Sequence, residues 1–171
     1  IDGSPDEVSA VRWIGKDTET TITRKEDANG EYFWVDYTRW TEKKTADAPS
    51  TDTGEEQEPE VERTANRSVF KSADRTVSVL KTLSPLAAKR SLDVSDDGKL
   101  DELGLKNPLS RIEVDRNGKT EILVVGSESY GSRDYFARHE ATGRIYIIER
   151  DVVQPLKYAR TRLPDRTLIS F

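Results

Sequence analysis

Short runs of hydrophobic and polar residues predict strands in the first part of the chain. Val8–Ile14, Thr20–Arg24 and Glu31–Thr38 are rich in β-branched and aromatic residues and are separated by short polar segments. The second separator contains Asn29-Gly30, and an Asn-Gly pair between two such runs is typical of a tight β-hairpin turn. The pattern therefore predicts a three-stranded antiparallel meander within residues 1–40.

Apolar residues at helical spacing follow further along the chain. Val77, Leu80 and Leu83 recur every third residue, which places them on one face of a helix. Ser72 offers an N-cap side chain, and Pro85 disfavours the helical conformation at the residue before it. We therefore expect a helix of about three turns that is capped by Ser72 and ends before Pro85.

A second group of strands is predicted in the C-terminal half. Leu109–Asp115 and Thr120–Val125 flank an Asn-Gly turn, and Tyr135–His139 and Arg144–Glu149 follow. Apolar and charged residues alternate in Leu109–Asp115, which indicates a strand with one buried face and one solvated face.

A short helix is expected near the C-terminus, from about residue 151 to about residue 158. It contains Pro155, which lacks an N–H group and is tolerated only near the first turn. Helices and strands are grouped along the chain and do not strictly alternate. The predicted fold class is therefore α+β, with antiparallel meander sheets, two or three short helices and one acidic loop.

The net charge of the chain is concentrated in residues 41–65. The 171 residues carry a net charge of −5. Residues 41–65 hold eight acidic and three basic residues, so the rest of the chain is charge-balanced. This acidic segment has no aromatic residue and contains Pro49 and Pro59, so it cannot bury enough apolar surface to offset the entropy of ordering. We expect a disordered loop there, or alternatively an acidic recognition segment, between residues 1–40 and an α+β domain at 66–171 that packs with residues 1–40 as one unit.

Residue types that the chain lacks exclude several kinds of site. There is no cysteine and one histidine, which excludes a disulfide framework, a thiol nucleophile and most zinc sites. The longest apolar run, Ile122–Val125, is far shorter than the ~20 residues that cross a bilayer. Because the chain has no methionine and opens at Ile1, we expect it to be a processed protein or an excised domain.

One acidic stretch is similar to a calcium loop. It places oxygen-bearing side chains at alternate positions, with Gly98 at the turn, as calcium loops do. The position that normally supplies a bidentate carboxylate is Gly104, so a polar turn that caps the segment Lys99–Leu103 is the favoured interpretation and calcium is the alternative. The candidate ligands are Asp93, Ser95, Asp97 and Asp101.

Patterns for catalysis are incomplete, and we expect no enzymatic activity. Gly126–Gly131 is superficially similar to a serine elbow, but neither serine in it has glycine both two residues before and two residues after. His139 is the single imidazole and lies on a predicted strand, where a structural role is expected. A hydrolase with paired carboxylates is the third alternative, because acidic side chains are numerous.

Two parts of the chain are candidate binding surfaces. Residues 156–166 carry a net charge of +3, yet the charge-balanced body does not predict a nucleic-acid partner. This basic segment is better suited to acidic headgroups or to the acidic segment of the same chain. Trp34, Trp40 and Tyr130 are candidate ligand or partner residues, and a glycan or small-molecule binding module with an aromatic cleft is the second alternative.

The C-terminal half carries a series of motifs in an order seen in one bacterial family. The motifs are Ala73-Asp74, Leu103-Gly104-Leu105-Lys-Asn-Pro108, Asp115-Arg-Asn-Gly118-Lys119, Leu123-Val-Val-Gly126, Tyr135-Phe-Ala-Arg138, Ile145-Tyr-Ile-Ile148 and Leu163-Pro-Asp165-Arg-Thr-Leu168. They resemble the family catalogued as domain of unknown function 4340, over residues 66–171 and more loosely over 8–40. The sequence departs from the family at Leu103, where members have an aromatic residue, and at Pro164, where they have arginine.

The resemblance implies a location and a role. Family members look like extracytoplasmic domains of membrane-anchored bacterial proteins, often encoded beside auxiliary components of an ABC-type transport system related to gliding. The family has no assigned catalytic residues. We therefore expect a non-enzymatic interaction or scaffold domain on the periplasmic side, anchored to the inner membrane by a segment outside this sequence. The expected partner is an envelope or membrane protein.

Overall fold

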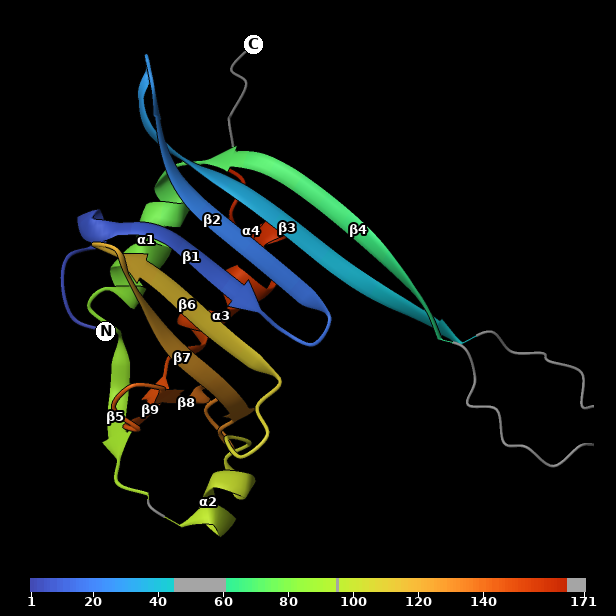
Figure 1. Cartoon of the computed structure of the whole chain (residues 1–171), viewed down its shortest axis with the longest axis vertical. Coiled ribbons are helices and arrows are strands. Elements are labelled where there is room, and N and C mark those ends of the chain that lie inside the picture. The colour runs from blue at the N-terminus through green and yellow to red at the C-terminus, as the bar shows by residue number, and fades with distance from the viewer. Residues whose placement is uncertain (45–60, 95, 166–171) are drawn as a thin grey trace, which may run out of the picture.

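The computed structural model describes residues 1–44, 61–94 and 96–165, which form one nine-stranded antiparallel sheet with helices on its faces (Figure 1). About half of the described residues lie in strands and about a fifth in helices. The strand order is β4-β3-β2-β1-β6-β7-β8-β9-β5. The strands are β1 (Val8–Ile14), β2 (Thr18–Asp27), β3 (Gly30–Lys44), β4 (Val61–Ser72), β5 (Ala88–Leu92), β6 (Ser110–Arg116), β7 (Lys119–Glu128), β8 (Tyr135–His139) and β9 (Ile145–Ile148).

The antiparallel arrangement is confirmed, but the fold is richer in strand than the balanced α+β prediction, and its strands form a single sheet. The two predicted groups of strands join because β1 pairs with β6, in a register that sets Val11 opposite Val114 and Trp13 opposite Ile112. These four side chains are all buried. Both groups therefore contribute to one core on the helix-covered face of the sheet.

In the part of the chain that the structure describes, four short α-helices accompany the sheet, against the two or three predicted. α1, α3 and α4 cover one face (Figure 1), and the Thr20 hydroxyl on β2 donates a 2.6 Å hydrogen bond to the Leu156 carbonyl on α3. α2 belongs to a smaller apolar cluster with Leu105, Val124 and Ile145 on the other side of the sheet. The helices are α1 (Asp74–Leu83), α2 (Asp97–Glu102), α3 (Arg150–Lys157) and α4 (Ala159–Arg162), and a single 3₁₀ turn spans Pro5–Glu7.

Two expectations about α1 and α3 were wrong. Ser72 does not cap α1; it is the buried last residue of β4, and its hydroxyl donates a 2.8 Å hydrogen bond to the Leu163 carbonyl. The N–H of Ala73 instead donates to the Asp165 carboxylate at 2.6 Å, so the cap comes from the distant C-terminal segment. Pro155 lies in the second turn of α3, which ends two residues later at Lys157. The helix is short enough that proline removes one hydrogen bond without interrupting further turns.

Both ends of the segment predicted to be disordered, residues 41–65, belong to strands. Residues 41–44 belong to β3 and residues 61–65 to β4, paired in register from Thr41 opposite Thr64 to Lys44 opposite Val61. The Arg63 side chain lies 3.4 Å from the Glu42 carboxylate and 5.8 Å from the centre of the Trp40 ring. Cross-strand charge and cation–π contacts therefore extend the hairpin into the segment. The remaining predicted loop, residues 45–60, lies outside the described residues.

Candidate functional site

The long hairpin of β3 and β4 reaches beyond the helix-covered body (Figure 1). β3 and β4 pair in one continuous register from Phe33 opposite Ser72 to Lys44 opposite Val61. β4 is an edge strand: within the described part of the chain it pairs with β3 alone. Residues 61–67 are all exposed. A long, regular edge of this kind leaves backbone N–H and C=O groups available for another strand.

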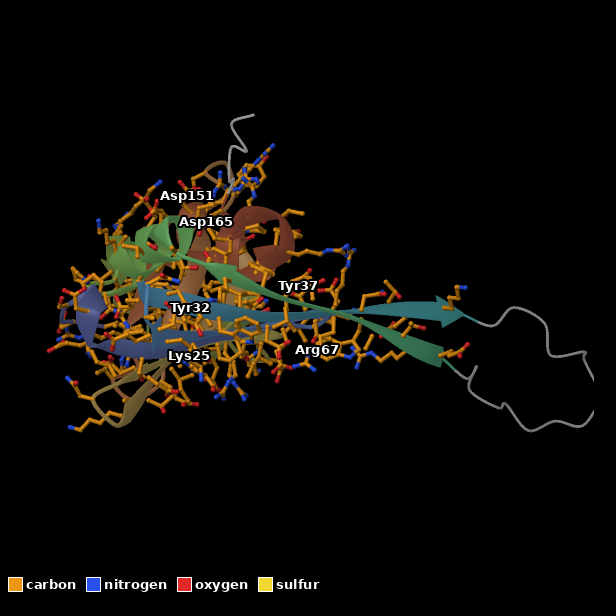
Figure 2. The ribbon with its side chains drawn as sticks, turned by 90° about the horizontal axis from the view of Figure 1, so that it is seen from above. Lys25, Tyr32, Tyr37, Arg67, Asp151 and Asp165 are labelled. Carbon is orange, nitrogen blue, oxygen red and sulfur yellow. The ribbon has the colours of Figure 1, made fainter. Side chains whose placement is uncertain are left out.

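The two faces of this hairpin differ in chemistry. Asp36 and Arg67 form an ion pair on the face away from the helices, and this contact holds the pKa of the Asp36 carboxyl below its ordinary value. Tyr37 is buried on the opposite face, as Figure 2 shows by placing Tyr37 and Arg67 on opposite sides of the ribbon. The open face is thus a polar, charge-paired surface, and the other face is turned toward the helices.

A cleft of about 710 Å³ lies where the hairpin leaves the body. Trp13, Trp40 and Tyr135 contribute aromatic side chains to its lining, and Ser127 and Lys157 contribute polar ones. Tyr135 is buried, and its hydroxyl donates a 2.8 Å hydrogen bond to Glu128. Burial, reinforced by this bond to Glu128, raises the pKa of Tyr135 to about 12. Tyr135 is therefore a neutral wall residue of the cleft at physiological pH.

The structure does not bring the three predicted aromatic residues together. Trp40 lines the 710 Å³ cleft, but Trp34 and Tyr130 do not. Trp34 is 39% exposed on the open face of β3, and Tyr130 is fully exposed in the loop after β7. Sequence reasoning missed Trp13 and Tyr135 as cleft residues, because their alternating strand positions predict burial and nothing local shows which cavity they border.

The structure describes three of the four predicted calcium ligands. Asp97 and Asp101 lie on α2, and Ser95 lies outside the described residues. Asp96 caps the helix by accepting a 3.1 Å hydrogen bond from the Gly98 N–H, which confirms the interpretation as a polar capping turn. Within the described ranges, no group of three or more His, Asp or Glu side chains is placed to hold a metal ion. Calcium binding at Asp93 and its neighbours stays a prediction.

The residues considered for hydrolysis have other contacts. His139 is buried, its Nδ1 accepts a 3.4 Å hydrogen bond from the Thr142 N–H, and its Nε2 lies 3.6 Å from the Glu121 carboxylate. The hydroxyl groups of Ser129 and Ser132 are hydrogen-bonded to each other. The carboxyl groups with shifted pKa values in the described segments all shift downward, whereas a general acid needs a raised pKa.

Asp134 is a buried carboxylate that fixes the loop before β8. It is 4% exposed, and Lys89 donates a 3.0 Å hydrogen bond to it from β5. The bond from Lys89 is the main cause that lowers the pKa of Asp134 below 3.8, and burial opposes it. A carboxyl group whose pKa is lower in the folded state than in the unfolded state stabilises the fold at pH values above its ordinary pKa. This stabilisation is lost as the pH falls through the pKa of the folded state.

We therefore expect the free energy of unfolding of the wild-type chain to decrease as the pH is lowered below about 4. The Asp134→Asn variant should lose less stability over the same pH range. Urea unfolding, followed by tryptophan fluorescence at a series of pH values, measures this difference. Asp101→Asn, at an exposed helix position, is the control and should keep the wild-type pH dependence. Equal slopes for Asp134→Asn and the wild type would contradict the assignment.

Comparisons with known proteins add no functional information about this chain. No family model, no curated protein and no solved structure matches this chain. Within the described residues no helix has the length and apolar character needed to cross a membrane. The resemblance noted in the C-terminal half stays a prediction.

Proposed function

We propose that this chain is a non-enzymatic interaction domain that captures an extended strand of a partner protein on the free edge of β4. The observation that carries the proposal is the length and regularity of this edge: β4 has 12 residues, and its register with β3 contains no bulge. Proteins usually protect an edge of this length with a bulge, a proline, charged side chains or a covering loop, and of these β4 has the charged side chains but neither a bulge nor a proline. Strand addition uses such an edge for main-chain hydrogen bonds.

The charge of β4 favours one kind of partner segment. Glu62 is its single acidic residue, against Arg63, Arg67 and Lys71. Each of these cations has an acidic partner on a neighbouring strand: Glu42 and Asp36 on β3 contact Arg63 and Arg67, and Asp27 on β2 contacts Lys71. Because β4 itself carries three cations and one acid, the fitting occupant is an extended segment with acidic side chains at alternate positions, which would lie beside these cations.

The cellular role in this proposal comes from the family resemblance. On that basis the domain is held on the periplasmic side of the inner membrane by a segment outside this sequence, as an accessory to an ABC-type transport or gliding-related envelope system. The partner is then an envelope or membrane protein of that system.

Paired proline variants of β4 test the proposal. Successive N–H groups of a strand point in opposite directions, so of Thr64→Pro and Ala65→Pro one removes an outward N–H group and the other a hydrogen bond to β3. We expect the outward variant to keep the wild-type melting temperature and to lose about tenfold or more in capture of the partner from membranes of the native organism. The other variant is expected to lose stability.

The outcome that contradicts the proposal is also defined. If the thermally stable proline variant retains the same envelope or transport proteins as the wild type, the β4 edge is not the docking site. Recovery of no such protein by the wild type would contradict the accessory role.

A ligand-binding module is the second candidate, and the aromatic lining of the 710 Å³ cleft favours it. In this candidate Trp40 forms one wall, and Trp13 and Tyr135 another part of the lining. Aromatic rings of this kind stack on sugar rings and other flat ligands. The β4 proline variants separate the two candidates, because an outward N–H group on β4 does not line the cleft.

A further inference from the structure

A second cleft, of about 570 Å³, lies between the hairpin and the junction of α3 and α4. Its lining comes from three segments that are distant in the sequence, and several of its side chains carry positive charge or hydrogen-bond donors. Its lining includes Tyr37 and Arg39 on β3, Asn66 on β4, and Tyr158, Arg160 and Thr161 at the helix junction.

Two arginines in this cleft differ from the other arginines of the hairpin. Arg63 and Arg67 each lie within ion-pair distance of an acidic side chain. Arg39 and Arg160 are exposed, and no acidic residue of the described part of the chain forms an ion pair with either. Their guanidinium groups are therefore available to a ligand.

Both guanidinium groups border the same cleft as the buried Tyr37. Burial raises the pKa of Tyr37, and Arg39 and Arg160 oppose this effect through their charge. Asp17 and Tyr158 are the other groups that act on Tyr37, and both raise its pKa. Asp17 lies in the adjoining 710 Å³ cleft, which Arg39 also borders. Arg39 on β3 and Arg160 on α4 therefore border one cleft from two elements that are distant in the sequence.

A third cation lies next to this pair. The ammonium group of Lys157 is 5.5 Å from the centre of the Tyr158 ring, at a cation–π distance. Lys157 borders the larger cleft, as Arg39 does. The hairpin and the helix junction therefore present three positive side chains around two clefts that share Arg39 in their lining, together with the amide of Asn66 and the hydroxyl of Thr161.

We propose that this cleft binds the phosphate group of a small molecule or of a lipid headgroup. Arginine forks donate paired hydrogen bonds to phosphate oxygens, and the amide and hydroxyl donors complete the oxygen contacts. The ring of Tyr158, which is 39% exposed, offers an apolar surface for the part of the ligand that carries the phosphate. This site is independent of strand capture, because Asn66 of β4 contributes its side-chain amide to the cleft and not the backbone groups of the strand edge.

Calorimetric titration of the whole chain tests the proposal with defined probes. The probes are glycerol 3-phosphate, inorganic phosphate, and vesicles of phosphatidylcholine with and without phosphatidic acid. We expect each single change, Arg39→Gln or Arg160→Gln, to weaken binding about tenfold and the double change about a hundredfold. Arg90→Gln, at an exposed position of β5 on the opposite sheet edge, should bind within about twofold of the wild type.

Further variants and outcomes keep the result decisive. Arg39→Lys and Arg160→Lys keep the charge but remove the paired donors, so they should bind between the wild type and the Gln variants. Binding of glycerol 3-phosphate assigns a soluble ligand, and binding of phosphatidic acid vesicles alone assigns a headgroup, provided that the double Gln variant loses it. No binding of any probe at millimolar concentration, or equal binding by the double variant and Arg90→Gln, would overturn the proposal. The β4 proline variant that stays folded should bind these probes normally, which separates this site from strand capture.

Discussion

Replacing Leu156 by alanine is expected to lower the free energy of unfolding by about 2–5 kcal/mol. Leu156 is 0% exposed on α3 and belongs to the main core. Its side chain fills space between the helix and the sheet, and its carbonyl accepts the hydrogen bond from Thr20. Truncation removes buried apolar surface and leaves a cavity, because close-packed surroundings collapse only in part.

Urea unfolding monitored by tryptophan fluorescence measures the loss. Leu109→Ala is the matched control, since it deletes the same atoms from a side chain that is 69% exposed. Its free energy of unfolding should stay within about 0.5 kcal/mol of the wild type. Equal effects of the two substitutions would mean that α3 is not docked on the sheet in solution.

Gly104→Ala is expected to destabilise the fold by about 2–4 kcal/mol. Gly104 has a φ of +68°, and an added Cβ would lie 2.3 Å from the Ser127 hydroxyl oxygen and 2.8 Å from the Ser127 backbone nitrogen. The Ser127 N–H donates a 2.9 Å hydrogen bond to the Leu103 carbonyl, so this nitrogen has little freedom to move. Alanine therefore suffers both backbone strain and a steric clash.

Gly118→Ala separates these two causes. Gly118 has a φ of +75°, and an added Cβ there would meet no atom within 4 Å. The control should cost about 1–2 kcal/mol, from the left-handed conformation alone. Because Gly104 borders the 710 Å³ cleft, only Gly104→Ala should also change that cleft. If both glycine variants lose the same stability in thermal unfolding, the close approach to Ser127 does not exist in solution.

The strands of the body could be predicted because their periodicity is local. β1 has the predicted bounds Val8–Ile14, and β8 has the predicted bounds Tyr135–His139. Both show alternate burial of their side chains. The Asn-Gly signal was equally reliable before β7, because Asn117 and Gly118 both adopt the positive φ that such a turn requires. These features depend on neighbouring residues alone.

β4 could not be predicted in the same way. Its residues alternate poorly in hydrophobicity, and nearly all of them are exposed. The strand exists because each residue pairs with β3, with contacts such as Asp36 to Arg67 and Trp40 to Arg63. Cross-strand pairing is a tertiary contact that composition does not reveal. The predicted bounds of the acidic loop, residues 41–65, therefore included residues that belong to β3 and β4. The cap on α1 was misassigned for the same reason, since Asp165 is 91 positions from the helix start at Asp74.

The sequence by itself determined the antiparallel strands, the balance of charge outside residues 41–65 and the absence of cysteine chemistry. These depend on residue type and on periods of two or three to four residues, which any short window contains. Only the tertiary structure decided that the described strands form one sheet with β4 at one edge, and that Arg39 and Arg160 border one cleft with Tyr37. Such juxtapositions arise from burying a common core, which brings β3 and α4 together across more than a hundred residues, and no local pattern encodes that distance.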